Sequence, residues 1–195
     1  PDAMNINMSA NEIGTYCCDY DLDFSGVSGL KAYIMSGFSP STSTLVLTPV
    51  TMVPAGTGLL LRGAEGNYEV PCTTTDMYYT NLLKGVTTAT TINPTDGEYT
   101  NFILSNGAHG IGFYTLSESG ELAANKAYLQ LPTASVASLS RAMRLVFADD
   151  ITGIDEKKAE TKKEDNIFYD LQGRRVDNPT QGLYIVNGKK VFINK

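Results

Sequence analysis

The chain has 195 residues, of which 42 % are hydrophobic and 18 % charged, and this length suffices for one well-buried domain with a small appendage. No run approaches the roughly 18–20 continuous apolar residues that a membrane-spanning helix needs. The net charge of −6 is uneven: residues 1–154 carry six Lys/Arg against fourteen Asp/Glu, hence −8, and residues 155–195 carry nine against seven, hence +2. An acidic body disfavours phosphate binding, so we predict no nucleic-acid partner.

Short runs of strand-forming residues, separated by Gly, Pro, Asn and Asp, recur along residues 1–154. We expect strands at 12–18, 20–24, 29–35, 44–53, 57–62, 67–70, 100–105, 111–117, 126–131 and 142–148. Residues 76–84 (DMYYTNLLK) are predicted as a short helix that Asp76 caps and Gly85 ends, and residues 134–141 as a helical turn. The fold class is therefore all-β, with the body an antiparallel sandwich or barrel-like domain.

Two pairs of segments in the body resemble each other. "GLKAYIM" (29–35) and "NKAYLQLP" (125–132) both contain Lys-Ala-Tyr, and "TMVPAGTGLLLRG" (51–63) and "SGELAANKAYLQLP" (119–132) both run from a turn of small residues into an apolar strand. Two halves of one β domain would produce this pattern, and so would chance similarity between turns rich in Ala and Gly.

The segment "DEKKAETKKED" at 155–165 contains no large apolar residue and is predicted to be a charged linker. It separates the body from a small β unit at 166–195, with strands at 166–171, 174–176, 182–186 and 189–194. Asn187-Gly188 predicts a type I′ hairpin turn. Thirty residues without Cys or His cannot bury a sufficient core alone, so we hypothesise that this tail is a closing cap or an export tag.

The tail text "YDLQGRRV…GLYIVNGKKV" resembles the C-terminal tail of secreted and surface proteins of Bacteroidetes, a wider family in which some members act as type IX sorting domains. The residues that carry the resemblance are Tyr169, Asp170, Gly173, Arg174, Arg175, Gly182, Tyr184, Asn187 and Gly188. In the body, "DFSGVSGLKAYIM", "VPAGTGLLLRG" and "ILSNGAHGIGFYTLSESGELAANKAYLQLP" resemble β modules that precede such tails. The resemblance implies a secreted or cell-surface protein, and it carries no catalytic residue to transfer. Because the chain starts at Pro1, we expect a mature fragment with upstream domains missing.

Three cysteines, Cys17, Cys18 and Cys72, are too few for a disulfide framework. Neighbours in a strand point to opposite faces, so Cys17 and Cys18 are expected in different environments. They are expected to be small buried residues, although a bridge from Cys72 to one of the pair stays open.

The stretch "DYDLDFSG" (19–26) places Asp19, Asp21 and Asp23 at the spacing of the first ligands of an EF-hand loop. That loop would need Gly where Phe24 stands and Glu where Leu30 stands. Because the aspartates alternate with apolar residues, the stretch instead predicts a half-buried strand with the aspartates on the outward face. We predict no metal site, the alternative being a cation site of another type on an edge loop.

Catalytic motifs are not evident. His109, in "NGAHGIG", is expected in a turn, and Cys72 has no neighbouring base or helix N-terminus that would lower its thiol pKa. Ser28 and Lys31 match Ser-x-x-Lys only formally, because flanking glycines break the helix on which that motif works. We predict neither an enzyme nor a cofactor.

Eleven tyrosines and no tryptophan suggest a hydrated binding surface, because a tyrosine combines an apolar ring with a polar hydroxyl. Tyr78, Tyr79, Tyr99 and Tyr114 are candidates for a platform on which a sugar stacks, and the alternative is that these rings fill the core. The favoured function is a non-catalytic exported surface module with a display, adhesion or accessory role and a cell-surface or glycan partner. One alternative is a glycan-binding module of a larger secreted enzyme, and another is a small hydrolase.

Overall fold

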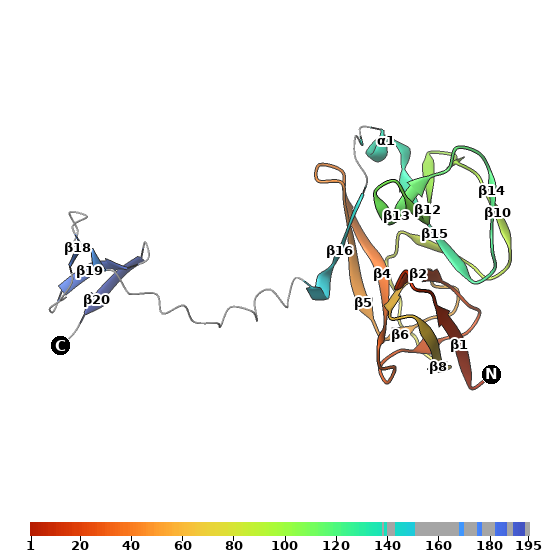
Figure 1. Cartoon of the computed structure of the whole chain (residues 1–195), viewed down its shortest axis with the longest axis horizontal. Coiled ribbons are helices and arrows are strands. Elements are labelled where there is room, and N and C mark those ends of the chain that lie inside the picture. The colour runs from red at the N-terminus through yellow and green to blue at the C-terminus, as the bar shows by residue number, and fades with distance from the viewer. Residues whose placement is uncertain are drawn as a thin grey trace. The chain divides into compact units, whose positions relative to one another are not determined.

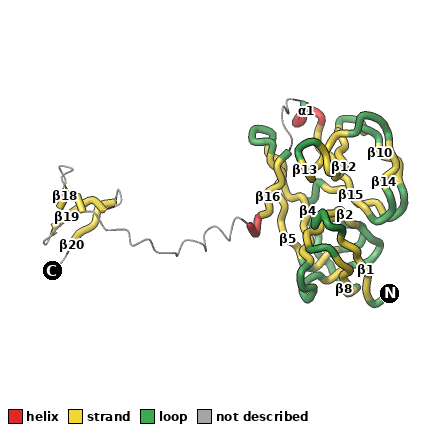
Figure 2. Tube along the Cα trace, in the orientation of Figure 1, coloured by secondary structure: helices red, strands yellow, loops and turns green. Residues whose placement is uncertain are grey.

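The computed structural model describes residues 1–137, 139 and 143–150, together with four strands between 168 and 193 (Figure 1). The chain divides into two compact units, Pro1–Gly153 and Ile154–Lys195. Strands and loops make up most of the described chain, and helix is confined to short turns such as α1 (Thr133–Val136) (Figure 2). The predicted all-β class is confirmed.

Sixteen strands are described in the first unit. They are β1 (Ala3–Met8), β2 (Ile13–Tyr16), β3 (Leu22–Asp23), β4 (Leu30–Ser39), β5 (Thr44–Val50), β6 (Met52–Val53), β7 (Leu59–Gly63), β8 (Gly66–Pro71), β9 (Leu83–Val86), β10 (Thr90–Ile92), β11 (Thr95–Asp96), β12 (Tyr99–Gly107), β13 (Gly110–Thr115), β14 (Gly120–Leu122), β15 (Lys126–Pro132) and β16 (Arg144–Phe147). One five-stranded sheet has the order β16-β5-β4-β7-β2, and the other contains β11-β12-β15-β9 with β13 beside β12. The pairs β1–β8, β3–β6 and β10–β14 form separate ribbons. The described pairs are antiparallel except β16, which runs parallel to β5.

The same set of strand pairings occurs twice in this unit. The first repeat, β2 to β7, pairs β2 with β7, β3 with β6, and β4 with both β5 and β7. The second repeat pairs β9 with β15, β10 with β14, and β12 with both β13 and β15. The registers agree as well: Tyr33 faces Leu60 in the first repeat, and Phe102 faces Leu129 in the second, each shifted by 69 positions along the chain. The first unit is therefore an internal duplication.

The duplication shows which of the two sequence similarities is structural. The similarity between the turns at 51–63 and 119–132 is, since Gly56 (φ 75°) and Asn125 (φ 58°) occupy equivalent left-handed positions before β7 and β15. Asparagine is among the residues that tolerate this conformation best after glycine. The shared Lys-Ala-Tyr does not reflect the duplication, because "LKAYIM" in β4 corresponds to "YTNFIL" in β12 and not to "NKAYLQLP" in β15.

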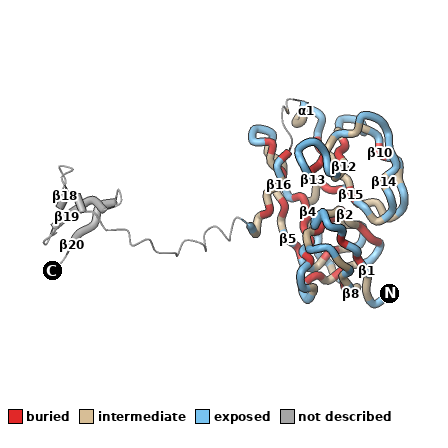
Figure 3. Tube along the Cα trace, in the orientation of Figure 1, coloured by how far each residue is buried: buried red, intermediate tan, exposed pale blue. Residues whose placement is uncertain are grey.

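Buried positions, red in Figure 3, recur along the strands of the first unit. Because side chains alternate between the two faces of a strand, these positions form two hydrophobic clusters. The shared core contains equivalent residues of both repeats, Tyr33 with Phe102 and Leu60 with Leu129, so the two sheets pack face to face. The first-repeat cluster lies on the opposite face of β4 and β7. It includes Leu30, Ala32, Ile34, Leu59 and Leu61, together with Ile6, Met8 and Val70 from the β1–β8 ribbon that covers them. Each such leucine contributes about 1.5–3 kcal/mol when it is fully buried.

Equivalent positions of the two repeats touch where the repeats meet. A Cβ on Gly58 would lie 3.1 Å from the Cβ of its counterpart Ala127. Gly85 similarly packs against its counterpart Cys17, and a Cβ added at Gly85 would overlap the Cys17 Sγ. Contact between equivalent positions indicates an approximate twofold relation between the repeats.

Several expected elements differ in the structure. Residues 73–82 contain no helix, so the predicted helix at 76–84 and its Asp76 cap are wrong, and Leu83 begins strand β9. Tertiary hydrogen bonds hold this segment extended: Asn81 Oδ1 accepts from the Met35 N–H (2.9 Å), and Asn81 Nδ2 donates to the Gly58 carbonyl (2.7 Å). The strand expected at 44–53 breaks at Thr51, and only residues 22–23 of the expected strand 20–24 are assigned to a strand. Strands β1, β9, β10, β11 and β14 were not predicted.

The second unit contains a four-stranded sheet in the order β18-β17-β19-β20. Its strands are β17 (Phe168–Tyr169), β18 (Arg175–Val176), β19 (Gly182–Val186) and β20 (Lys189–Ile193). The hairpin predicted from 182–186 and 189–194 is confirmed by the antiparallel pairing of β19 with β20. Tyr169, Arg175, Gly182 and Tyr184 of the tail motif lie in these strands. The linker 155–165 and the motif residues Asp170, Gly173, Arg174, Asn187 and Gly188 lie outside the described residues.

Candidate functional site

The two repeats differ on the sheet face that is turned away from the shared core. In the first repeat this face is the apolar cluster beneath the β1–β8 ribbon. In the second repeat it consists of alternate residues of β12, β13 and β15, and we call it the outer face. Its residues are Tyr99, Asn101, Ile103, Tyr114, Tyr128 and Gln130. Among the described residues, no ribbon equivalent to β1–β8 belongs to the second repeat.

Two amides occupy the centre of the outer face. Asn101 faces Gln130 across the β12–β15 pair, and Gln130 Nε2 donates to Asn101 Oδ1 (3.1 Å). Asn101 is only 3 % exposed, and its own Nδ2 donates to the Asn93 carbonyl (3.0 Å). Burial of an amide is tolerated because both of its ends are hydrogen-bonded. The Asn101 amide therefore holds the partly exposed Gln130 amide in one orientation.

Tyr128 lies beside the amide pair, two residues before Gln130 on β15, and faces Lys84 on β9. Burial raises the pKa of the Tyr128 hydroxyl, and the nearby negative charge of Asp96 raises it further. The hydroxyl therefore stays protonated at neutral pH and can act as a hydrogen-bond donor.

Tyr114 is fixed against the β12–β13 hairpin. Its hydroxyl donates to the Gly110 carbonyl (2.7 Å) and accepts from the His109 N–H (3.2 Å). The ring lies over Gly107, where a Cβ would come within 2.7 Å of the ring atom Cε1. Glycine at position 107 thus makes room for the ring, and the hydroxyl closes the turn.

Tyr99 begins β12 at the opposite end of the outer face, and 45 % of its surface is exposed. It faces Pro132 on β15 and Asp96 on β11. Tyr114 faces Ile103, four residues further along β12, so Tyr99 and Tyr114 are separated by about 13 Å along the strand direction.

The four tyrosines predicted from the sequence do not lie on one surface. Tyr99 and Tyr114 share the outer face, whereas Tyr78 and Tyr79 belong to the segment that connects the repeats. Tyr79 packs against the first-repeat cluster and donates its hydroxyl to the Met52 carbonyl (2.8 Å), while Tyr78 is 88 % exposed. Sequence reasoning missed Tyr128. The similarity between segments 51–63 and 119–132 could have identified it, because that alignment places Tyr128 at the position of the buried Leu59 of the first repeat.

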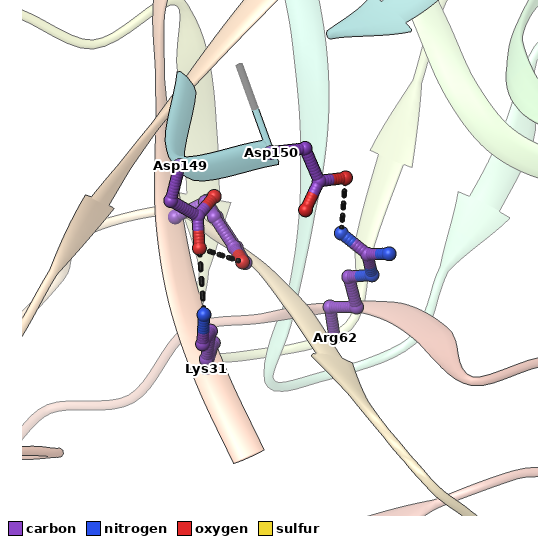
Figure 4. Close-up of polar contacts among 5 residues, drawn as sticks. Lys31, Arg62, Asp149 and Asp150 are labelled. Atoms are coloured by element: carbon purple, nitrogen blue, oxygen red, sulfur yellow. Dashed lines mark hydrogen bonds and ion pairs between the residues drawn. The ribbon is translucent and has the colours of Figure 1, made fainter. Parts of the chain in front are cut away.

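A second polar cluster holds residues 147–150, the last described residues of the first unit, against β4 and β7 (Figure 4). Asp149 Oδ2 accepts from Lys31 Nζ (2.7 Å) and from the Tyr33 hydroxyl (3.1 Å), and Arg62 pairs with Asp150 (2.7 Å).

Beneath these pairs, the Phe147 ring packs edge-on against Tyr33, with ring centroids 4.8 Å apart. The Arg62 guanidinium carbon lies 4.5 Å from the centroid of the same ring. The second repeat has Thr100 and Leu131 at the positions of Lys31 and Arg62. We therefore assign this cluster a structural role.

The acidic stretch 19–23 also has a structural role. Asp21 Oδ1 accepts from the Ala55 N–H (2.7 Å) and Oδ2 from the Thr75 N–H (3.0 Å), which lowers the pKa of this carboxyl. Asp23 accepts from the Ser25 N–H (2.8 Å) in a local turn. In the part of the chain that the structure describes, no group of three or more His, Cys, Asp or Glu is placed to hold a metal ion.

All three cysteines are free. Cys18 packs in the first-repeat cluster and Cys17 against Gly85, so the two occupy different environments as predicted. Burial raises the pKa of the Cys17 thiol to about 12 and also raises that of Cys18. His109 lies in the exposed β12–β13 turn of the second repeat, and Cys72 follows β8 beside the first-repeat cluster.

None of the helices in the described part of the chain is both long and apolar enough to cross a membrane. Comparisons with models of protein families, with curated proteins and with solved structures found no match.

Proposed function

We propose that the chain is a non-catalytic module of an exported surface protein, with a display or adhesion role, and that it makes contact through the outer face of the second repeat. The observation that carries this proposal is the difference between the repeats. The same sheet face is a covered apolar core in one repeat and a partly exposed face of tyrosines and amides in the other.

Packing does not require these residue types. The positions equivalent to Tyr99, Tyr128 and Gln130 hold Leu30, Leu59 and Leu61 in the first repeat, and all three leucines are buried. Tyrosine combines a broad apolar ring with a polar tip, which suits a surface that meets both water and a partner. The second repeat therefore has a surface for binding where the first has a core.

Export is supported by the resemblance of the tail to those of Bacteroidetes surface proteins, which rests on the text from Tyr169 to Val191. A hydrolase finds less support. Cys72 and His109, which a thiol hydrolase would need side by side, belong to different parts of the first unit, and no described contact joins them.

Export is tested by producing the full chain, and a chain that ends at residue 165, each behind the leader peptide of an exported host protein, in a Bacteroidetes host. We expect protease applied to intact cells to digest the full chain, and the shortened chain to stay inside the cells. Equal surface exposure of both chains would contradict the tag role, and protection of both would contradict export.

Adhesion is tested by coating beads with the full chain and counting the cells or mucus-coated surfaces to which they attach. We expect attachment to fall when Tyr99 is replaced by Ala. The Tyr20→Ala variant is the matched control, because Tyr20 is 44 % exposed and lies in the first repeat. Absence of attachment by the unmodified chain, or equal loss in both variants, would contradict a binding role for the outer face.

A further inference from the structure

We infer that the outer face of the second repeat binds a neutral oligosaccharide, with Tyr99 and Tyr128 stacking on sugar rings and the Gln130 amide hydrogen-bonding to hydroxyls between them. This inference rests on the proposed binding role of the same face and names the ligand class for it.

The arrangement of the three residues follows from the β12–β15 register. Asn101 faces Gln130, Tyr99 precedes Asn101 by two residues, and Tyr128 precedes Gln130 by two residues on the antiparallel strand. The two tyrosines therefore flank the amide pair on opposite sides, about 13 Å apart along the strand direction. This separation exceeds the width of one sugar ring, so it selects a chain of sugars over a single one.

The chemistry of the face matches a carbohydrate. A pyranose ring presents flat patches of C–H groups and a rim of hydroxyls, so it needs an aromatic face and groups that both donate and accept hydrogen bonds. A glutamine amide has two donor hydrogens and an acceptor oxygen, and the bond to Asn101 uses one of the hydrogens. Because Asn101 is buried and itself bonded to Asn93, the amide is oriented before a ligand arrives, which lowers the entropic cost of binding.

Charge distinguishes a neutral ligand from an anionic one. Lys84 faces Tyr128 from β9, while the negative charge of Asp96 acts on the Tyr128 hydroxyl, so the two charges near this ring oppose each other. The surrounding body carries −8 over residues 1–154, which repels sulfated glycans, uronic-acid polymers and nucleic acids. A neutral oligosaccharide meets no such repulsion.

The test is an array of neutral and anionic oligosaccharides probed with the full chain, followed by calorimetric titration with the neutral oligosaccharide that gives the strongest signal. Two variants change the face. Tyr99→Ala removes an exposed ring, and Gln130→Leu installs the residue that the first repeat has at the equivalent position. Tyr20→Ala and Tyr78→Ala remove exposed rings elsewhere and serve as controls. Thermal melting confirms that each variant is folded.

We expect Kd to rise about tenfold or more in Tyr99→Ala, since one stacked ring is worth roughly 1.4 kcal/mol or more. In Gln130→Leu we expect a rise of about threefold to tenfold, since one net hydrogen bond is worth about 0.7–1.4 kcal/mol, and in the controls a change of less than about twofold. Binding only to anionic glycans, or an equal loss in Tyr78→Ala, would overturn the inference. Loss of self-association in Tyr99→Ala, measured by sedimentation, would also overturn it, because the face would then join two copies. If no oligosaccharide binds while coated beads still attach to cells through Tyr99, the inference fails and the adhesion proposal stands. If neither occurs, both fail.

Discussion

Replacement of Gly85 by Ala tests whether the two repeats meet as described. Gly85 lies in β9, where it faces Ala127 of β15, and its missing side chain leaves room for Cys17. An added Cβ would overlap Cys17 Sγ and lie 2.8 Å from the Gly56 carbonyl oxygen. Rotation of the Cys17 side chain could move its Sγ, but the Cys17 Cβ lies 3.0 Å from the added atom and the Gly56 oxygen is backbone, so a strand must shift. Overpacking of this kind costs about 1–3 kcal/mol, and since one kcal/mol moves the Tm of a domain of this size by about 2–4 °C, we expect Tm to fall by about 2–12 °C.

The assay is thermal unfolding of the full chain followed by circular dichroism, with Gly14→Ala as the matched control. Gly14 is also a strand glycine, but a Cβ there would meet nothing within 4 Å, so its replacement should leave Tm unchanged or raise it slightly. In a Cys17→Ala background the penalty of Gly85→Ala should shrink, because the nearest obstructing atom is gone. Equal Tm values for Gly85→Ala and the unmodified chain, or the same decrease in Gly14→Ala, would refute this account of the interface.

Three further outcomes are expected. Burial alone would raise the pKa of Asp149, but hydrogen bonds from Lys31 and Tyr33 lower it overall. The stability from this carboxylate is therefore present above its unfolded pKa and is lost as the pH falls through the folded value. Because Lys31 is largely exposed, we expect Asp149→Asn to cost under about 1 kcal/mol at pH 7 in chemical denaturation, and we expect the difference to shrink as the pH falls below the pKa of an unfolded aspartate, about 4; a difference that grows in acid would contradict the pairing. Iodoacetamide at pH 8 should modify Cys72 faster than Cys17, whose thiol is buried with a pKa of about 12, and mass spectrometry that finds the reverse order would place Cys17 at the surface. Millimolar calcium should leave Tm unchanged, because both carboxylate oxygens of Asp21 already accept backbone hydrogen bonds; a calcium-dependent rise in Tm that Asp21→Ala abolishes would show a cation site.

Local patterns were sufficient for the all-β class and for most strands of the body. Apolar and polar residues alternate in "NKAYLQLP", which contains strand β15, whereas "GLKAYIM" is mostly apolar and contains the start of β4, a strand buried on both faces. The tail hairpin followed from Asn187-Gly188 between two apolar strands, and β19 pairs with β20 as expected. Alternation of neighbouring side chains also predicted that Cys17 and Cys18 occupy different environments, which they do, although β2 ends at Tyr16 and the expected strand 12–18 does not reach them. In each case the determining interaction is between residues close in sequence, so a short window contains it.

The similar turns before β7 and β15 suggested two halves, but only the tertiary structure established the duplication, the extended segment 73–82 and the outer face. Most of the repeat is not visible in the sequence because equivalent positions differ in chemistry, as with Leu30 and Tyr99, and the match becomes evident only when both are found in the same register against β7 and β15. Residues 76–84 have a helical pattern, but hydrogen bonds from Asn81 to Met35 and Gly58 hold the segment extended. The sequence by itself determined which residues can alternate in a strand. Which strand face is buried under a ribbon and which stays in contact with water depends on partners far away along the chain, and those are fixed only when the sheets pack.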